Sequence, residues 1–343
     1  MRLEARGSSN ELSSVCRRLL QGFALRNDNF YLFRLSSFVS RLSSLVSRLY
    51  PQPLTTSYCL LPTSSHLKGP QARPRSSMHL SLGISTCPND TYIYEALIAG
   101  LENSPFEWEV HYADVQTLNE MVRQGVLDVA KVSAQVFPKI ECDYRHMQCG
   151  GAIGYGCGPL LLSSAAESFN PGAPTTLPGA DTTAALLFKF WYEREIGGGP
   201  TVRYALFNEV YQSLRAGESA QGVVIHEHRF TWKRDGLHLL ADLGAYWENK
   251  TNSPIPLGIS VIRRTFSEEV VREVELEIRR SIAVARARKD LVTPFIEQLA
   301  QIEDRKVIED HIKMFVNDFS ENVGEKGTIA LERLWQVAIG KKG

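Results

Sequence analysis

Five turns in the sequence carry residue types that can do chemistry, and the first is Ser85-Thr-Cys-Pro-Asn-Asp90. Cys87 is a possible nucleophile, while Asn89 and Asp90 can cap a helix or contact a bound molecule. No second catalytic-looking cysteine and no paired histidine accompany Cys87. We therefore expect a turn whose Asn89 and Asp90 face a substrate, with a plain helix cap as the alternative. We also expect Cys87→Ala to cost little turnover.

The second and third turns could line a binding cleft. In Lys131-Val132-Ser133, the cation and the hydroxyl would share one face of an extended chain and meet one anion. A solvated lysine after a strand is the alternative. Five glycines fall within residues 150–158, which indicates close backbone approach or unusual φ angles. No helix follows a G-x-G-x-x-G pattern there, so we expect a hinge or a cleft-lining loop rather than a dinucleotide site.

The fourth turn opens a helix. Residues 178–185 read PGADTTAA, and Thr182, Thr183 and Ala184 stand where the first helical turn is expected. The N–H groups of a first turn have no partner within the helix, and the helix dipole places partial positive charge there. A carboxylate ligand therefore fits this position, with an ordinary N-cap as the alternative.

The fifth turn follows the apolar run Val223-Val-Ile225 and contains His226 and His228. If the strand continues, both histidines lie on one face at its end. A neutral imidazole in that position can act as a general base near neutral pH, although a structural histidine is the alternative. A zinc site would need a third protein ligand, and none is recognisable in the sequence.

These turns need a scaffold that brings strand ends together. Strand-like and helix-like patterns alternate through residues 78–225, and the tail from residue 267 is almost entirely helical. This alternation predicts an α/β fold with parallel sheets, in which ligands bind at the carboxyl ends of strands. The expected strands are 78–84, 108–112, 127–132, 160–163, 175–177, 202–206 and 222–225, and the expected helices are 91–100, 115–124, 210–216 and one from 182.

The chain is expected to cross between two halves twice, near residues 160–165 and again near 252–256. Two crossings make a hinged protein of two lobes with its ligand in the cleft between them. We assign residues 78–163 and 254–343 to the first lobe and residues 164–253 to the second.

Residues 1–77 form a basic leader and linker that we exclude from the fold. Eleven Lys and Arg stand against three Asp and Glu there, a net charge of +8 that leaves −8 for the remainder of a neutral chain. The repeat RLSSFVS-RLSSLVS at residues 34–47 predicts a basic amphipathic helix. Such a segment is typical of an organellar transit peptide, for a mitochondrion or plastid. The alternatives are a start-site artefact before Met78 in a cytoplasmic protein, and a helix that binds a membrane surface or a partner.

The remaining composition narrows the possible partners. The acidic body gives no electrostatic reason to expect nucleic acid. No run of eighteen apolar residues exists, so we expect no stable membrane insertion. The six cysteines form no C-x-x-C pair, which argues against a zinc site or a disulfide framework and for a reducing compartment. The sequence indicates no particular oligomeric state.

In order along the chain, these motifs resemble one family, the 1,4-dihydroxy-6-naphthoate synthases of the futalosine route to menaquinone. Single segments are weak signals, whereas nine in the same order are specific, and they cover essentially all of residues 78–343. The matching segments are CPNDTYIYEAL (87–97), ADVQTLNEM (113–121), DVAKVS (128–133), GGAIGYGCGPLL (150–161), PGADTTAALL (178–187), IHEHRFTW (225–232), GLHLLADLGAYWE (236–248), PIPLG (254–258) and FVNDFSENVGEKG (315–327).

The resemblance implies a two-lobed, periplasmic-binding-protein-like (type II) fold with a central cleft, used as an enzyme. It implies a carbon–carbon lyase that acts on cyclic dehypoxanthinyl futalosine, a small molecule with an aromatic carboxylate, and leaves the dihydroxynaphthoate. It implies no metal or redox cofactor. The family's proton-abstracting histidine falls on His226, and its substrate contacts fall on Lys131, Val132, Ser133, Thr183 and Ala184.

The sequence departs from the family pattern at Ala130, Ala134, Ala180, Asp181 and His228. Asp181 places a negative charge at the helix start where an anion is expected, and a nearby cation such as Lys131 is one candidate to offset it. The second hypothesis is therefore a non-catalytic or differently specific binder of a small carboxylate on the same scaffold, which would need no base. A transporter-associated binding protein is a third.

Overall fold

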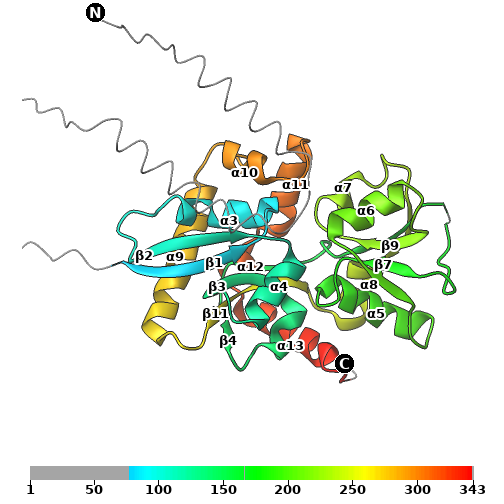
Figure 1. Ribbon diagram of the computed structural model, residues 1–343, viewed down its shortest axis with the longest axis horizontal. Helices are drawn as coiled ribbons and strands as arrows, with labels where there is room; N and C mark the ends of the chain where they lie inside the picture. Colours follow the sequence, from blue (N-terminus) through cyan, green and yellow to red (C-terminus); the bar gives the residue numbers. More distant parts are fainter. Residues whose placement is uncertain (1–76, 166, 342–343) are drawn as a thin grey trace, which may run out of the picture. The chain divides into compact units, whose positions relative to one another are not determined.

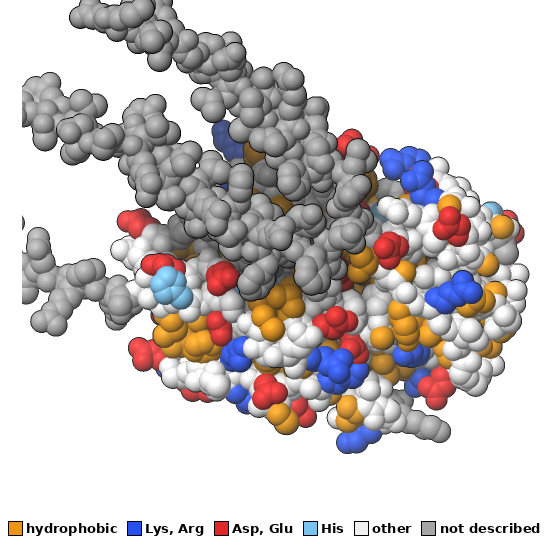
Figure 2. Space-filling view, viewed as in Figure 1, with side chains coloured by type: hydrophobic (Ala, Val, Ile, Leu, Met, Phe, Trp, Pro, Cys, Tyr) orange, Lys and Arg blue, Asp and Glu red, His pale blue; other side chains and the backbone are white. Residues whose placement is uncertain are grey.

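The computed structural model describes residues 77–165 and 167–341, which form an α/β fold with two separate sheets (Figure 1). The basic leader, with its repeat at residues 34–47, lies outside the described residues except for Ser77, so the transit peptide and the organellar location stay predictions. Among the helices that are described, none is long and apolar enough to cross a bilayer. On the face drawn in Figure 2, the visible lysine and arginine side chains are interspersed with acidic ones.

The first sheet has the strand order β2-β1-β3-β11-β4, with β5 paired to β11. Strands β1 to β3 run in parallel, whereas β11 runs antiparallel to β3, β4 and β5. The prediction of parallel sheets is therefore wrong, because the chain re-enters this sheet beside the end of β3 and must run back along it. The strands are β1 (Met78–Ile84), β2 (Phe106–Tyr112), β3 (Val129–Ser133), β4 (Tyr144–His146), β5 (Ala152–Gly154) and β11 (Ile255–Arg263).

The second sheet, at the right of Figure 1, has the strand order β10-β6-β9-β7-β8. It is also mixed, since β7 is parallel to β8 and β9 while β6 is antiparallel to β9 and β10. The strands are β6 (Leu160–Ser163), β7 (Thr175–Leu177), β8 (Val202–Tyr204), β9 (Gln221–Val224) and β10 (His238–Asp242).

The chain passes from the first sheet to the second between β5 and β6, which is earlier than the expected crossing at residues 160–165. It returns between α8 (Leu243–Thr251) and β11, close to the expected second crossing. A Cβ on Gly158 would lie 2.2 Å from the Cα of Gly244, so the first crossing can pass over the start of α8 only because both residues are glycine. The lobe boundaries assigned from the sequence stay predictions.

Helices accompany both sheets, and those predicted at 91–100, 115–124 and 210–216 are confirmed to within three residues at each end, while the one predicted from 182 begins at 183. The segments between first-sheet strands contain α3 (Pro88–Ile98), α4 (Val115–Arg123) and the 3-10 helix η1 (Ala134–Lys139). The second-sheet segment contains α5 (Thr183–Glu195), α6 (Phe207–Arg215), α7 (His228–Thr231) and α8. The helical tail contains α9 (Glu268–Arg286), α10 (Pro294–Leu299), α11 (Arg305–Phe315), α12 (Asp318–Glu321) and α13 (Gly324–Ala338).

Helix α9 shows how the tail fastens to the first sheet. Its buried Val271, Val274, Ile278 and Ile282 recur every three or four residues and so form one apolar face. This face joins the core that contains the inward side chains of β1 and α3, and α9 packs directly on α3. The side chain of Ser267 caps the helix by accepting a hydrogen bond from a first-turn N–H. The tail thereby holds α3, whose first turn contributes to the site.

Candidate active site

A single pocket between the two sheets collects the residues predicted to do chemistry. Those in its first-sheet wall come from the start of α3 and from β3, and those in its second-sheet wall come from the start of α5 and the turn after β9. Turns that are far apart in the sequence therefore meet at one cavity, although the roles of their residues stay predictions. The wall contains every predicted site residue: Asn89, Asp90, Lys131, Val132, Ser133, Thr182, Thr183, Ala184 and His226.

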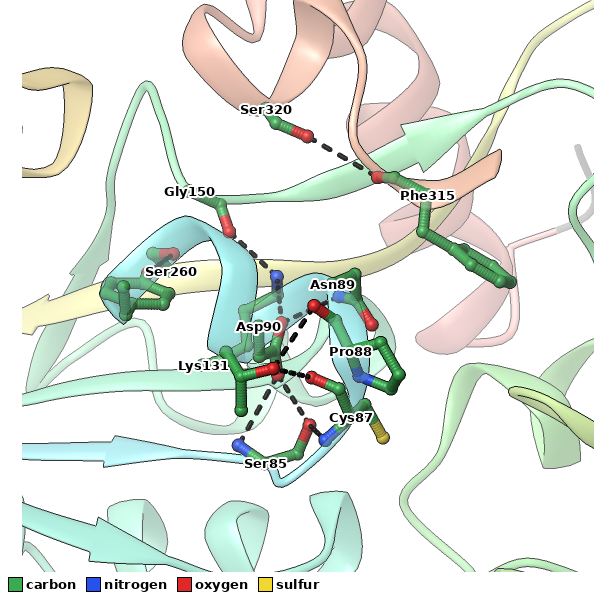
Figure 3. Close-up of polar contacts among 12 residues, drawn as sticks. Ser85, Cys87, Pro88, Asn89, Asp90, Lys131, Gly150, Ser260, Phe315 and Ser320 are labelled. Carbon is green, nitrogen blue, oxygen red and sulfur yellow. Dashed lines mark hydrogen bonds and ion pairs between the residues drawn. The ribbon is translucent and has the colours of Figure 1, made fainter. Parts of the chain in front are cut away.

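The first-sheet wall contains a buried ion pair (Figure 3). Lys131 Nζ lies 3.0 Å from Asp90 Oδ1 and donates a hydrogen bond of 2.7 Å to the backbone oxygen of Gly150. Asp90 also accepts hydrogen bonds from the hydroxyl of Ser85 at 2.7 Å and from the amide of Asn89 at 2.8 Å. Both charged side chains are only 5% exposed. The opposite charges offset each other, and the ammonium group retains one hydrogen for a bound molecule.

Asp181 lies beside the pocket but not in its wall. Its carboxylate pairs with Arg123 at 2.8 Å and with Lys139. Lys131, the candidate cation named from the sequence, does not offset this charge, because it is bound to Asp90. The charge of Asp181 is offset by the two cations, and its carboxylate does not occupy the start of α5.

The start of α5 faces the pocket. Thr182 caps the helix by accepting a hydrogen bond of 3.2 Å from the N–H of Ala185, and the hydroxyl of Thr183 donates to the backbone oxygen of Leu257 at 3.0 Å. Thr183 and Ala184 line the cavity, and helix geometry gives their N–H groups no partner within α5. A helix start of this kind attracts an anion through its N–H groups and its dipole.

His226 contributes the imidazole of the second-sheet wall. Strand β9 ends at Val224, and His226 follows in a turn with a φ of 57°, a strained conformation for a residue with a side chain. Its ring packs edge-on against Phe207, with 4.9 Å between the ring centroids. Burial lowers the pKa of His226 to about 4, and the nearby Lys131 acts in the same direction. The imidazole is therefore neutral at physiological pH and can accept a proton.

Cys87 lies next to this imidazole, with 3.4 Å between its sulfur and His226 Nδ1. The expectation that Cys87 has no paired histidine is wrong, because the fold supplies one from 139 residues away. Burial, together with the charges of Glu227 and Asp90, holds the pKa of the thiol well above its usual value. The thiol therefore stays protonated near neutral pH, which argues against a nucleophile and for a hydrogen-bond partner of His226.

His228 does not share the pocket with His226. Because β9 ends before either histidine, the expected common face does not form, and His228 begins α7 instead. Its ring stacks on Tyr211, with 3.8 Å between the centroids and 7° between the planes. Of the two histidines at the fifth turn, only His226 is placed to meet a ligand.

Two buried groups near His226 carried no signal in the sequence. Glu227 is 1% exposed, and His311, in the amphipathic tail helix α11, is fully buried. His311 Nδ1 lies 3.8 Å from Glu227 Oε2, and the rings of His311 and His226 are 6.0 Å apart. Burial raises the pKa of Glu227 to about 7 and lowers that of His311 well below its usual value, so burial shifts both groups toward their uncharged forms.

The glycine-rich segment is confirmed as a cleft-lining loop, since Ala152, Cys157 and Gly158 belong to the pocket wall. Arg229, which sequence reasoning did not single out, also lines the pocket. It donates hydrogen bonds to the backbone oxygen of Gly158 at 2.5 Å and to Asp242 Oδ2 at 2.8 Å. These bonds hold the loop against the start of α8. No group of three metal-ligating side chains occurs within residues 77–165 and 167–341.

Comparison with known proteins identifies the family. A family model described as menaquinone biosynthesis matches residues 80–339. The chain belongs to this family. A 1,4-dihydroxy-6-naphthoate synthase from Streptomyces coelicolor is 37% identical over 74% of this chain and 91% of its own length. One from Thermus thermophilus is 37% identical over 76% of this chain and 93% of its own. The names of these menaquinone-family relatives indicate an enzyme.

Solved structures identify the fold of this family member. Protein AF1704 from Archaeoglobus fulgidus has a TM-score of 0.71 at 27% identity, over 76% of this chain and 97% of its own. The periplasmic aliphatic sulphonate binding protein of Escherichia coli has a TM-score of 0.53 at 11% identity, over 77% of this chain and 87% of its own. The expected two-lobed, periplasmic-binding-protein-like fold with a central cleft is confirmed.

Proposed function

We propose that this protein is a carbon–carbon lyase that converts cyclic dehypoxanthinyl futalosine to 1,4-dihydroxy-6-naphthoate, with His226 as the general base. One observation carries the proposal: a neutral imidazole and the start of α5 line the same pocket as Lys131 and Ser133. Removing a proton from the substrate needs such a base. Holding the aromatic carboxylate of the same substrate needs an anion-binding group. Membership of the menaquinone biosynthesis family supports the pathway.

The substrate carboxylate would accept hydrogen bonds from the N–H groups of Thr183 and Ala184. Lys131 has one ammonium hydrogen left for a substrate oxygen, and Ser133 offers a hydroxyl beside it. Asp90 already accepts from Lys131 and from its own turn, so its part is to hold Lys131 in place. The apolar Val132 completes this side of the wall.

The proposal assigns to His226 the tautomer in which Nδ1 carries the hydrogen and donates it to Cys87. Nδ1 faces the thiol sulfur at 3.4 Å, and a sulfur atom is a weak acceptor for the Nδ1 hydrogen. In that tautomer Nε2 carries the lone pair and takes the proton from the substrate. The electron pair left behind forms a new double bond as the carbon–carbon bond to the sugar-derived part breaks. The pair released from the broken bond then takes the proton back from the imidazolium.

The second candidate function is binding of a small carboxylate without turnover. It is favoured by the fold, which this chain shares with binding proteins, and by the departures from the family pattern at Ala130, Ala134 and Ala180. Such a protein would use the start of α5 and the cleft but would have no need of the Cys87–His226 pair. The presence of that pair favours the lyase.

Incubating the full chain with cyclic dehypoxanthinyl futalosine, and following dihydroxynaphthoate by mass spectrometry, separates the two candidates. The lyase proposal expects product from the wild type and little from His226→Gln. His228→Gln is the matched control, because it removes an imidazole outside the pocket and should leave turnover in place. A wild-type protein that binds the compound and never converts it would exclude the lyase and support the binder.

A further inference from the structure

The turn that precedes α5 is held by residues of two helices, α4 and η1, that connect strands of the first sheet. The N–H of Asp181 donates to Gln116 Oε1 at 3.0 Å, and its backbone oxygen accepts from the amide of Asn119 at 2.9 Å. Its carboxylate accepts from Arg123 Nη1 at 2.8 Å and from Lys139. Every one of these partners lies in α4 or η1, between strands of the first sheet, whereas Asp181 lies between β7 and α5 of the second.

The carboxylate of Asp181 is much more deeply buried in this contact than the two cations that pair with it. The side chain of Asp181 is 10% exposed, while those of Arg123 and Lys139 are 49% and 50% exposed. The carboxylate has thus lost most of its contact with water and depends on the two cations to offset that loss. The cations remain largely solvated and are held less tightly.

Asn119 extends the contact to the opposite wall of the pocket. It is fully buried, its amide nitrogen donates to the backbone oxygen of Asp181, and its Oδ1 accepts from the N–H of Ser133 at 2.9 Å. One side chain therefore ties the end of β3 to the residue directly before Thr182, the cap of α5. Because both of these segments line the pocket, their separation sets the distance between the two groups that would hold the ligand.

We propose that Asp181 is a positioning residue that latches the start of α5 to α4, with Asn119, Arg123 and Lys139 as its partners. The latch holds Thr183 and Ala184 at a fixed distance from Lys131 and Ser133, and it keeps the pocket assembled before a ligand arrives. This inference rests on the proposed function for the identity of the ligand but not for the existence of the latch.

Amide hydrogen exchange of the unliganded full chain tests the latch without any substrate. Asp181→Asn keeps the size of the side chain and the backbone bonds but removes both ion pairs. It should raise the exchange rate over residues 179–186 and at Ser133 by about fivefold, the effect of losing two partly exposed ion pairs. Arg123→Gln, at an exposed position, should raise the same rates to a smaller extent, and the double variant should add little to Asp181→Asn.

Asp235→Asn is the matched control. Asp235 is also a mostly buried carboxylate, at 12% exposure, paired with two exposed arginines, Arg215 at 3.6 Å and Arg234 at 3.4 Å, that lie on its own side of the pocket. It should leave exchange over residues 179–186 unchanged. Unchanged exchange in both Asp181→Asn and Arg123→Gln would overturn the latch, and so would an equal rise in Asp235→Asn.

Binding of 1,4-dihydroxy-6-naphthoate gives the functional readout. If the latch exists, Asp181→Asn should weaken binding by up to about fivefold and raise KM by a similar factor with little change in kcat, because the base and its partners are untouched. A variant that loses kcat and keeps KM would contradict a positioning role. If the wild type does not convert cyclic dehypoxanthinyl futalosine, the proposed function fails, while the exchange rates still decide whether the latch exists.

Discussion

The two walls of the pocket use their polar groups in opposite ways. In the first-sheet wall, the carboxylate of Asp90 and the ammonium group of Lys131 are buried together, and the surrounding turn offsets most of their hydrogen-bonding capacity. In the second-sheet wall, the start of α5 offers backbone N–H groups, and His226 offers a neutral imidazole. The first wall therefore commits most of its charged and polar groups to one another, and the second keeps more of them available for a ligand.

The largest effect should come from the second wall. His226→Gln removes the base and should lower kcat by about 10²- to 10⁴-fold, the usual contribution of a positioned general base. The free energy of unfolding should change little, because His226 makes its one described polar contact with Cys87. Steady-state kinetics and urea unfolding of the same preparation check both. In the wild type, kcat/KM should fall only as the pH drops toward about 4, where the imidazole becomes protonated.

Removing the cation of the first wall should affect the fold more strongly than it affects the chemistry. Lys131→Met leaves the buried carboxylate of Asp90 without its counter-ion, which should lower the free energy of unfolding by about 3–5 kcal/mol. Lys313→Met, which breaks an exposed pair with Glu309, is the control and should cost far less. Urea unfolding curves measure both. Equal losses in the two variants would remove the distinction between the walls.

Acid should destabilise the fold through three histidines that are held neutral by burial. Burial lowers the pKa values of His226 and His228 to about 4 and that of His311 well below its usual value. Between pH 6.5 and about 4 these histidines bind protons in the unfolded chain but stay neutral in the folded protein. The free energy of unfolding should therefore fall as the pH drops through this range. Glu227, whose pKa is raised to about 7, acts oppositely and loses its contribution as the pH rises from 4.5 through 7.

The three imidazoles outnumber the one carboxyl group, so the wild type should be less stable at pH 5 than at pH 7. His228→Gln removes one of them without touching the pocket, and it should flatten this dependence. Urea midpoints at both pH values provide the measurement. A stability that stays constant from pH 7 to pH 5 would show that these histidines are not kept neutral by the fold.

The smallest effect should come from replacing Cys87, which contacts His226 from the other side of the pocket. Cys87→Ala should lower kcat several-fold and leave KM unchanged, because the tautomer of His226 loses its partner while the ligand contacts remain. Because of this contact, we now expect a larger loss of turnover than the small one expected from the sequence alone. Cys87→Ser, whose hydroxyl can still accept the Nδ1 hydrogen, should recover part of the loss, and ring ¹⁵N shifts of His226 should report the tautomer. A loss as large as that of His226→Gln would identify the thiol as the nucleophile.

Strand-end position was enough to predict one pocket from the sequence, since Lys131, Ser133, Thr183 and His226 each follow or end an apolar run or open a helix. The partners of these residues could not be predicted. Cys87 meets His226, and Asp181 meets Arg123, only because turns and helices attached to the two sheets come together at and beside the pocket. No periodicity within either segment encodes that meeting. Strand β11, which is not among the predicted strands, and its direction escaped prediction for the same reason, because they depend on where the chain re-enters the first sheet.

A crystal structure with 1,4-dihydroxy-6-naphthoate bound would test the division between the walls most directly. The account predicts the carboxylate within about 3 Å of the N–H groups of Thr183 and Ala184, and the ring beside Nε2 of His226. It also predicts the Asp90–Lys131 pair unchanged, with Lys131 contacting the product only through its third hydrogen. A carboxylate that instead displaces Asp90 and pairs with Lys131, away from α5 and His226, would contradict it.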